Sequence, residues 1–562
     1  MSTDKYGSAR WANENDLRAE GISAIGVPSV REFASLKEMR AYYTSKDPGL
    51  GAFLLSRLVS PSELLAGARS EYVASTSGLL AGMANWFSGA QKSGRSGDLI
   101  GWLGDGHITT IAPTRSGKGV GLVIPNLLNY PGSVLVVDPK GENYAVTSRC
   151  RRDAMGQEVI CLDPFGICEE ETHFINPLDG LVNPRRKPET YLDDNPALID
   201  EISVIVDAMI VRGKDEKDPH WNDKARTLLK GLTLAVVCGF GPKMGRHLGE
   251  VRNLLLQPRN RLTRMFDEWS FEENVAGGAL SRAALEIQSM AEQELSSVIS
   301  TAARHTEFLD SAQALRSIGF NQQGGSMRYD MRNLKAEGCV SIYMIVPPHH
   351  LTKYSRLIRL WVTAAASAMT RTIGRPADGY PVLFLLDEIA QLGRMEPLIQ
   401  AVSLLAGYGM SMWMVWQDLA QMKALYEGEW SSFLANSKIQ QYFGVNDYET
   451  AKYVSDMLGE ATIDVSSVSE SRSTSRNTKE FIGSNVGGGS ANTFSEISRS
   501  LMKPDEIRRL NREIMLTFVQ GCPPIVSKRL AYFRDPEFEG RFDANPGMAG
   551  HGVGAAIKSA GR

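Results

Sequence analysis

Short apolar runs that end in polar residues constrain the fold of this chain more than any other feature. The runs "HITTIA" (107–112), "SVLVVD" (133–138) and "EVICLD" (158–163) are nearly continuous, and helical stretches separate them. Runs of this kind are typical of strands that are buried on both faces of a parallel sheet. The alternation of strand and helix therefore predicts an α/β fold from about residue 107.

The strand pattern stops near Pro177, and a long region with helical spacing follows it. Strand patterns return at "CVSIYMIVP" (339–347), "PVLFLLDE" (381–388), "SMWMVWQ" (411–417) and "KIQQYF" (438–443). The sequence thus predicts one α/β domain that is interrupted by a helical domain.

Composition shifts divide the chain further. Residues 465–500 are rich in Ser, Thr, Asn and Gly, which are too polar to form a core, so we expect a flexible linker or loop there. The expected order is an N-terminal segment (1–100), the first part of the α/β domain (101–189), an inserted all-alpha domain (190–315), the second part of the α/β domain (316–464), the linker or loop (465–500), C-terminal strands of the α/β domain (501–540) and a disordered tail (541–562).

Net charge is uninformative about the class of protein, whereas the cysteine content argues against two kinds of site. The formal net charge is −3, so no global basic field marks a nucleic-acid binder, and DNA contacts would come from local patches or from assembly around a pore. The six cysteines include no close CxxC pair, which argues against a zinc site or disulfide framework and indicates a reducing compartment. His349 and His350 lack spaced partner ligands, so we expect a structural role for them.

The chain also lacks a candidate membrane span. A spanning helix needs about 20 apolar residues, and the best runs, "GLLAGMANWF" (78–87) and "GLTLAVVCGFG" (231–241), are much shorter. The first residues contain no apolar signal-peptide region. We therefore expect a cytoplasmic chain without a transmembrane segment.

The stretch "APTRSGKG" (112–119) lies between a predicted strand and an apolar helical run. In the phosphate-loop pattern GxxxxGK[ST], backbone N–H groups surround the phosphates and the lysine reaches the outer ones. Ala112 replaces the first glycine and Gly119 replaces the hydroxyl residue, so the motif alone leaves a surface Gly-Lys turn as an alternative. Its place between strand and helix favours a nucleotide site with Lys118 as the phosphate lysine. The residues expected to bind the nucleotide are Thr114, Arg115, Ser116, Gly117, Lys118, Gly119 and Val120.

Two acidic residues follow the apolar run that ends at Leu386. Asp387 is expected to hold Mg²⁺ through water, and Glu388 to orient and deprotonate the attacking water. Gln417 ends the next predicted strand, where it could sense the terminal phosphate or its water; a helix cap is an equal alternative. Arg115 and Arg394 are candidates for phosphate contacts within or between subunits, with solvated surface arginines as the alternative.

Together these motifs resemble those of the coupling proteins of type IV secretion and conjugation, the TraG-like DNA-transfer ATPases. The similarity runs from "GSARWA" (7–12) through "APTRSGKGVGLVIPNLL", "VLVVDPKGENYAVTS" and "FLLDEIAQLGRMEPL" to "LMKPDEIRRL". The resemblance implies a RecA-like P-loop NTPase domain with an inserted all-alpha domain. It also implies a homo-hexamer that uses ATP and Mg²⁺ to bring single-stranded DNA with an attached relaxase, or a protein effector, to channel components at the inner membrane.

The resemblance refines the site and the expected location. Many members of this family carry a glycine after the loop lysine, so Gly119 is compatible with membership. The ion would then depend on Asp387, nucleotide oxygens and water, or on Ser116. The family usually has two transmembrane helices before the "GSARWA" stretch, which here begins at residue 7, so we expect these residues at the cytoplasmic face of the membrane.

Two alternative functions stay open at this point. One is a cargo receptor whose nucleotide site organises the oligomer without productive hydrolysis, which the missing hydroxyl at Gly119 motivates. The other is an FtsK-like pump for double-stranded DNA. The lack of a recognisable winged-helix domain at the C-terminus weighs against the pump.

Overall fold

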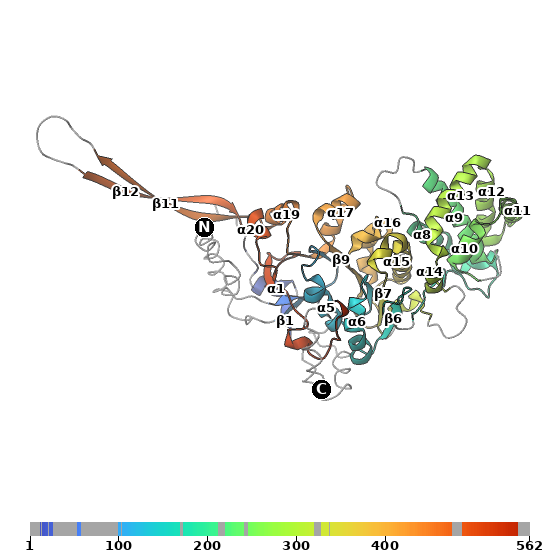
Figure 1. Cartoon of the computed structure of the whole chain (residues 1–562), viewed down its shortest axis with the longest axis horizontal. Helices are drawn as coiled ribbons and strands as arrows, with labels where there is room; N and C mark the ends of the chain where they lie inside the picture. The colour runs from blue at the N-terminus through green and yellow to red at the C-terminus, as the bar shows by residue number, and fades with distance from the viewer. Residues whose placement is uncertain are drawn as a thin grey trace, which may run out of the picture.

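The computed structural model describes residues 10, 12, 14–20, 22–25, 53–57, 99–102, 104–168, 172–211, 220–240, 245–319, 328–336, 338–474 and 486–548. The helical insertion lies at one end of the long axis and a two-stranded ribbon lies at the other, with the large sheet between them (Figure 1). Within these ranges, no helix combines the length and apolar character that a membrane crossing requires.

A 12-stranded sheet forms the centre of the described molecule, in the order β1-β3-β2-β14-β13-β10-β4-β9-β8-β5-β7-β6. The strands from β10 to β6 run parallel, and those from β13 to β1 add antiparallel strands at one edge. The strands of this sheet are β1 (Ile22–Ile25), β2 (Phe53–Arg57), β3 (Leu99–Trp102), β4 (His107–Ile111), β5 (Val134–Val137), β6 (Glu158–Leu162), β7 (Val340–Met344), β8 (Val382–Leu386), β9 (Met410–Trp416), β10 (Ser437–Phe443), β13 (Ile514–Val519) and β14 (Ile525–Lys528).

The parallel strands are buried on both faces, which explains their nearly continuous apolar sequence. In β5, Val134 and Val136 pack in one apolar cluster, whereas Leu135 and Val137 pack in another on the opposite face. Alternate residues of a strand point to opposite faces, so both sets must be apolar when helices cover both sides. The strands predicted at 107–112, 133–138, 158–163, 339–347, 381–388, 411–417 and 438–443 are confirmed as β4 to β10.

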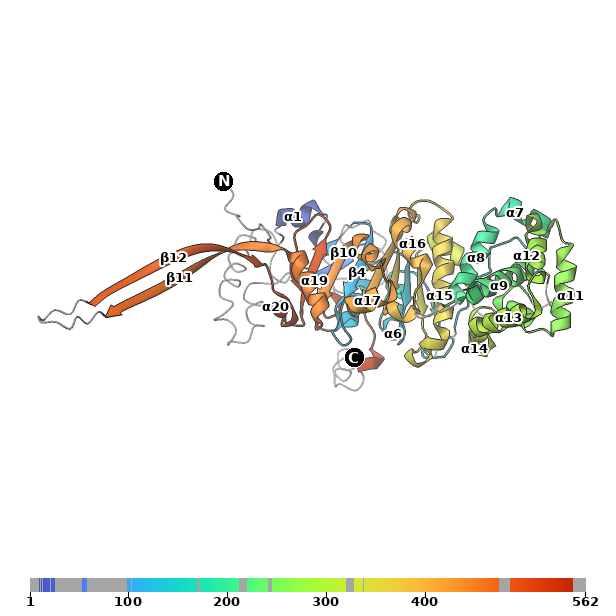
Figure 2. The same cartoon turned by 90° about the horizontal axis from the view of Figure 1, so that it is seen from above.

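Helices cover the sheet and build the insertion, and α15 lies between the two (Figure 2). All regular elements described from α7 to α14 are helical, as the insertion was predicted to be. The α-helices are α1 (Glu14–Ala19), α5 (Ile124–Asn129), α6 (Glu142–Arg149), α7 (Tyr191–Asp194), α8 (Leu198–Met209), α9 (His220–Cys238), α10 (Leu248–Leu255), α11 (Arg259–Ser270), α12 (Ala279–Gln288), α13 (Glu292–Thr306), α14 (Ala312–Ser317), α15 (Pro348–Thr370), α16 (Glu396–Leu404), α17 (Leu419–Leu425), α18 (Trp430–Ala435), α19 (Tyr448–Leu458) and α20 (Pro504–Arg508).

The predicted flexible linker or loop at 465–500 is wrong for the residues that the structure describes there, because they form strands. They belong to a two-stranded antiparallel ribbon of β11 (Glu460–Thr474) and β12 (Val486–Ser500), paired from Glu460↔Ser500 to Thr474↔Val486. Residues 475–485, within the same prediction, lie outside the described residues. The polar composition was misleading because a ribbon forms its ladder from backbone groups, which any non-proline residue can supply.

The predicted disordered tail (541–562) is wrong for its first residues. Arg541 is buried, the backbone N–H of Asp543 donates to the Val146 carbonyl at 3.0 Å, and Arg149 Nε forms an ion pair with Asp543 at 2.7 Å. These contacts hold residues 541–548 against α6. Residues 549–562, the rest of that prediction, lie outside the described residues.

Candidate functional site

The predicted phosphate loop connects β4 to a continuous helical segment. This segment starts with a π-helical turn, Gly119–Val123, and continues as α5. Thr114 and Arg115 are exposed, whereas Ser116 is buried. The loop therefore has the strand–turn–helix context that phosphate binding at a helix start requires.

The two glycines of the loop, Gly117 and Gly119, differ in whether their position could accept a side chain. Gly117 has a φ of +86°, a backbone conformation that residues with a side chain rarely adopt, and a Cβ there would lie 2.3 Å from Arg529 Nη1, so the arginine would have to shift. A Cβ on Gly119 would meet no described atom within 4 Å. The structure thus explains Gly117 by its backbone conformation and its contact with Arg529, and it shows no steric need for glycine at position 119.

Arg529, which the sequence analysis missed, contacts this loop from the far end of the chain. Its Nη1 donates to the Gly117 carbonyl at 3.0 Å, and its guanidinium lies 5.2 Å from the ring centre of Phe443. A separation of 412 residues leaves no local signal in the sequence for this contact. Arg529 fixes the carbonyl of the loop residue directly before Lys118.

Lys118 meets both acidic residues that follow β8. Its Nζ lies 3.3 Å from Asp387 Oδ1 and 3.7 Å from Glu388 Oε1, and the three side chains are 13%, 17% and 18% exposed. Glu388 also accepts a hydrogen bond from Gln391 Nε2. Its backbone has a φ of 58°, which is uncommon for a residue with a side chain and is typical of functional turns.

Sheet order brings Gln417 to the same edge. β9 lies between β4 and β8, and all three strands are parallel, so their carboxyl ends share one edge of the sheet. Gln417 follows β9 directly, and its backbone N–H donates to Gln421 Oε1 at 3.2 Å. It thus lies at the sheet edge between the phosphate loop and the acidic residues.

Three buried polar atoms support a fit for nucleotide and Mg²⁺ at this site. Ser116 Oγ, Lys118 Nζ and Asp387 Oδ1 are shielded from water and make no hydrogen bond with the described residues, although Lys118 and Asp387 lie within ion-pair distance. Buried polar groups without hydrogen bonds are costly unless a ligand satisfies them. A hydroxyl, an ammonium and a carboxylate are groups suited to phosphate oxygens and to a hydrated Mg²⁺.

Asp138, at the end of β5, is a further acidic group near the site that the sequence analysis did not select. It is buried, and its Oδ2 accepts a hydrogen bond from the backbone N–H of Tyr144 at 2.9 Å. Burial, with smaller contributions from the negative charges of Asp387 and Glu142, raises the pKa of Asp138 to about 7. The carboxyl that ends the strand beside β8 therefore titrates near neutral pH.

This pKa predicts a pH dependence of stability. Between about pH 4 and pH 7 the folded chain keeps a proton on Asp138 that the unfolded chain has released, so stability from this group is lost as pH rises through that range. Asp138→Asn removes the ionisation and keeps the acceptor for Tyr144. In urea unfolding without nucleotide, we expect the variant to gain up to about 4 kcal/mol relative to wild type between pH 4 and pH 7.5. A difference that does not change with pH would contradict the raised pKa.

The other residues considered in the sequence, two arginines and a histidine pair, take no part in the contacts of Lys118 with Asp387 and Glu388. Arg394 Nη2 forms an ion pair with Glu429 at 2.6 Å and lies over the ring of Tyr426, whereas Arg115 is an exposed loop residue with a φ of 61°. His350 stacks on Phe165 with ring centres 4.5 Å apart. The described part of the chain contains no group of three His, Cys, Asp or Glu residues that could hold a metal ion.

Comparisons with known proteins agree with this fold. A family model described as "Type IV secretory system Conjugative DNA transfer" matches residues 77–547. The conjugal transfer protein TraG of Escherichia coli is 28% identical, over 95% of this chain and 78% of TraG. The protein VirD4 of Rhizobium radiobacter is also 28% identical, over 78% of this chain and 59% of VirD4.

Solved structures of the conjugative coupling protein TrwB share the fold. A sulphate complex has a TM-score of 0.55 at 15% identity, over 87% of this chain and 98% of TrwB. A complex with ADP and Mg²⁺ has a TM-score of 0.52 at 15% identity, over 77% of this chain and 87% of TrwB. The fold is therefore the predicted RecA-like α/β fold, and the chain belongs to the type IV secretion family of conjugative DNA-transfer coupling proteins.

Proposed function

We propose that this coupling protein is an ATPase that hydrolyses ATP to move cargo to a type IV secretion channel. The observation that carries the proposal is the meeting of Lys118 with Asp387 and Glu388 at the end of the parallel sheet. The TrwB structure with ADP and Mg²⁺ supports the choice of ligands. The cargo we propose is a single DNA strand with its attached relaxase, or a protein effector, and the working unit is a homo-hexamer at the inner membrane.

Different residues of the site would bind the phosphates, hold Mg²⁺ and activate the attacking water. Lys118 would turn from the two carboxylates to the outer phosphates, while the backbone of Thr114–Val120 would surround them. Asp387 and Ser116 would hold Mg²⁺, directly or through water, and the ion would neutralise phosphate charge when bound. Glu388 would orient the attacking water and accept its proton, and Gln417 would contact that water or the terminal phosphate.

Removing the amine of Lys118 tests the site as a whole. We expect Lys118→Ala to lower ATP turnover by at least about a hundredfold, because the variant lacks the charge that binds and stabilises the outer phosphates. Phosphate release by the purified full chain, measured with and without a single-stranded oligonucleotide, gives the rate. Lys423→Ala is the matched control, because it removes a lysine from an exposed ion pair with Glu449.

The outcomes separate the motor from its main alternative. Turnover that the oligonucleotide raises and Lys118→Ala removes would support an ATP-driven motor. If wild type binds ATP tightly but hydrolyses none of it, the proposal fails and a cargo receptor with an organising nucleotide site takes its place. A preference for double-stranded DNA would instead favour an FtsK-like pump.

A further inference from the structure

One buried arginine joins the helical insertion to the rest of the molecule. Arg359 lies within α15 and is 2% exposed. Its Nε donates to the Ala208 carbonyl at 2.9 Å, and its Nη2 lies 3.5 Å and 3.4 Å from the carbonyls of Asp207 and Ile210. The last carbonyls of a helix lack partners within it, and a cation is favourable at that end. Arg359 therefore caps the C-terminus of α8, a helix of the insertion.

The same guanidinium holds the segment that follows Glu388. Its Nη1 donates to the carbonyls of Leu392 and Arg394, at 3.1 Å and 2.7 Å. Leu392 ends a single 3₁₀ turn, Ile389–Leu392, that begins directly after Glu388. Glu388 has a left-handed backbone conformation, which persists only when the surrounding structure imposes it. In this segment, the contacts of Arg359 reach the carbonyls of Leu392 and Arg394, close behind Glu388.

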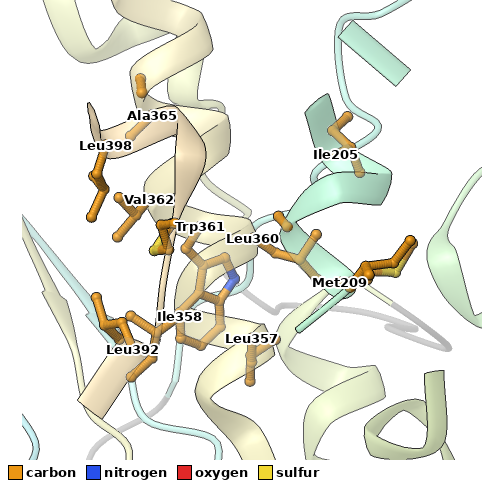
Figure 3. Packing of buried hydrophobic residues seen from close by; sticks show 14 of the residues in the cluster. Ile205, Met209, Leu357, Ile358, Leu360, Trp361, Val362, Ala365, Leu392 and Leu398 are labelled. Carbon is orange, nitrogen blue, oxygen red and sulfur yellow. The ribbon is translucent and has the colours of Figure 1, made fainter. Parts of the chain in front are cut away.

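Side-chain packing follows the same route. In Figure 3, Leu360 of α15 is directed toward Met209 of α8, and Ile358 is directed toward Leu392. All four are fully or almost fully buried members of one apolar cluster. Close-packed interiors deform little, so this packing would pass a displacement of α8 to α15 and to the turn after Glu388.

We propose that Arg359 is a positioning residue that couples the helical insertion to Glu388. A shift of the C-terminus of α8 breaks the hydrogen bonds of Arg359 to that helix unless the 389–394 segment moves with it. Burial lowers the pKa of Arg359 to about 10, so the guanidinium stays charged at neutral pH and the loss of its carbonyl partners is costly. The position of the insertion thereby sets the position of Glu388. The link to hydrolysis rests on the proposed ATPase function.

A variant within the insertion tests whether the displacement is transmitted. Arg226 of α9 forms a bidentate ion pair with the side chain of Asp207 in α8, so Arg226→Gln disturbs the end of α8 through a contact that does not involve Arg359. Hydrogen exchange of the full chain without nucleotide reports on the 389–395 amides. We expect Arg226→Gln to speed their exchange by about fivefold or more. In a protein that already carries Arg359→Lys, Arg226→Gln should change the exchange rate of the 389–395 amides little further. The single ammonium of lysine cannot hold both the carbonyls of α8 and those of the segment after Glu388.

Arg371→Gln is the matched control. Arg371 follows α15 and contacts Glu201 of α8 at 3.0 Å, but none of its described hydrogen bonds reaches the segment after Glu388. Its loss should leave exchange at 389–395 unchanged. Unchanged exchange at 389–395 in Arg226→Gln would overturn the coupling, as would an effect of Arg226→Gln that persists in full in the Arg359→Lys background.

Steady-state kinetics gives the second readout. We expect Arg359→Lys to lower kcat for ATP by about tenfold and to leave KM within about twofold, since Arg359 acts on the position of Glu388 and not on nucleotide binding. An equal loss in Arg371→Gln would mean a general structural effect and would overturn the inference. If wild type shows no hydrolysis, the proposed function fails, and the exchange experiment alone decides the coupling.

Discussion

The Glu388→Gln protein is expected to bind ATP nearly as tightly as wild type and to hydrolyse it about 100- to 10,000-fold more slowly. Glutamine has the shape of glutamate and can still hydrogen-bond a water, but it cannot take the proton that the water must lose. Glu388 has the required surroundings, because it is half-buried, 3.7 Å from Lys118 and hydrogen-bonded to Gln391. The substitution removes its negative charge and leaves Asp387 as the acidic partner of Lys118.

Single-turnover hydrolysis and equilibrium binding of a nucleotide analogue separate the two parts of this prediction. Glu449→Gln is the isosteric control, because Glu449 forms an exposed ion pair with Lys423 on α17. We expect the control to keep wild-type turnover. A Glu388→Gln protein that hydrolyses ATP within about threefold of wild type would rule out Glu388 as the general base.

The sheet could be predicted because its strands carry a signal within the sequence. A strand buried on both faces must be apolar at nearly every position, and β5 to β9 meet that requirement over four to seven residues each. The ribbon of β11 and β12 carries no such signal, because its pairing uses backbone groups and its composition is polar. Composition alone could not separate this ribbon from a linker.

Part of the candidate site could also be predicted from the sequence, and part could not. Asp387 and Glu388 directly follow one apolar run, Lys118 lies in the loop that follows another, and parallel strands bring such ends to one edge. Arg529 and Arg359 were not predictable, since each acts through contacts with backbone carbonyls that lie far away in the sequence. A carbonyl is present in every residue, so no residue type marks the partner of a buried arginine.

A third arginine, Arg151, also acts through backbone carbonyls, at the helix that follows the phosphate loop. Arg151 is fully buried, and its guanidinium donates to the carbonyls of Leu127, Tyr130 and Gly132 at 2.6, 2.9 and 2.8 Å. Its Nε donates to Ser341 Oγ at 2.5 Å. These carbonyls lie in and just after α5, whose last C=O groups have no partners within the helix. Arg151 thus holds the far end of the helix that begins at the phosphate loop.

We therefore expect Arg151→Ala to reduce the free energy of unfolding by roughly 3 to 5 kcal/mol, because it leaves buried carbonyls unpaired and opens a cavity. Urea unfolding followed by circular dichroism measures the loss. The neighbouring Arg152→Ala is the control, because Arg152 is exposed and should change stability by less than about 1 kcal/mol. A similar small change in both variants would show that the carbonyls at the end of α5 find other partners without Arg151. A selective loss would instead show that the helix behind the phosphate loop is fixed at its far end by one side chain.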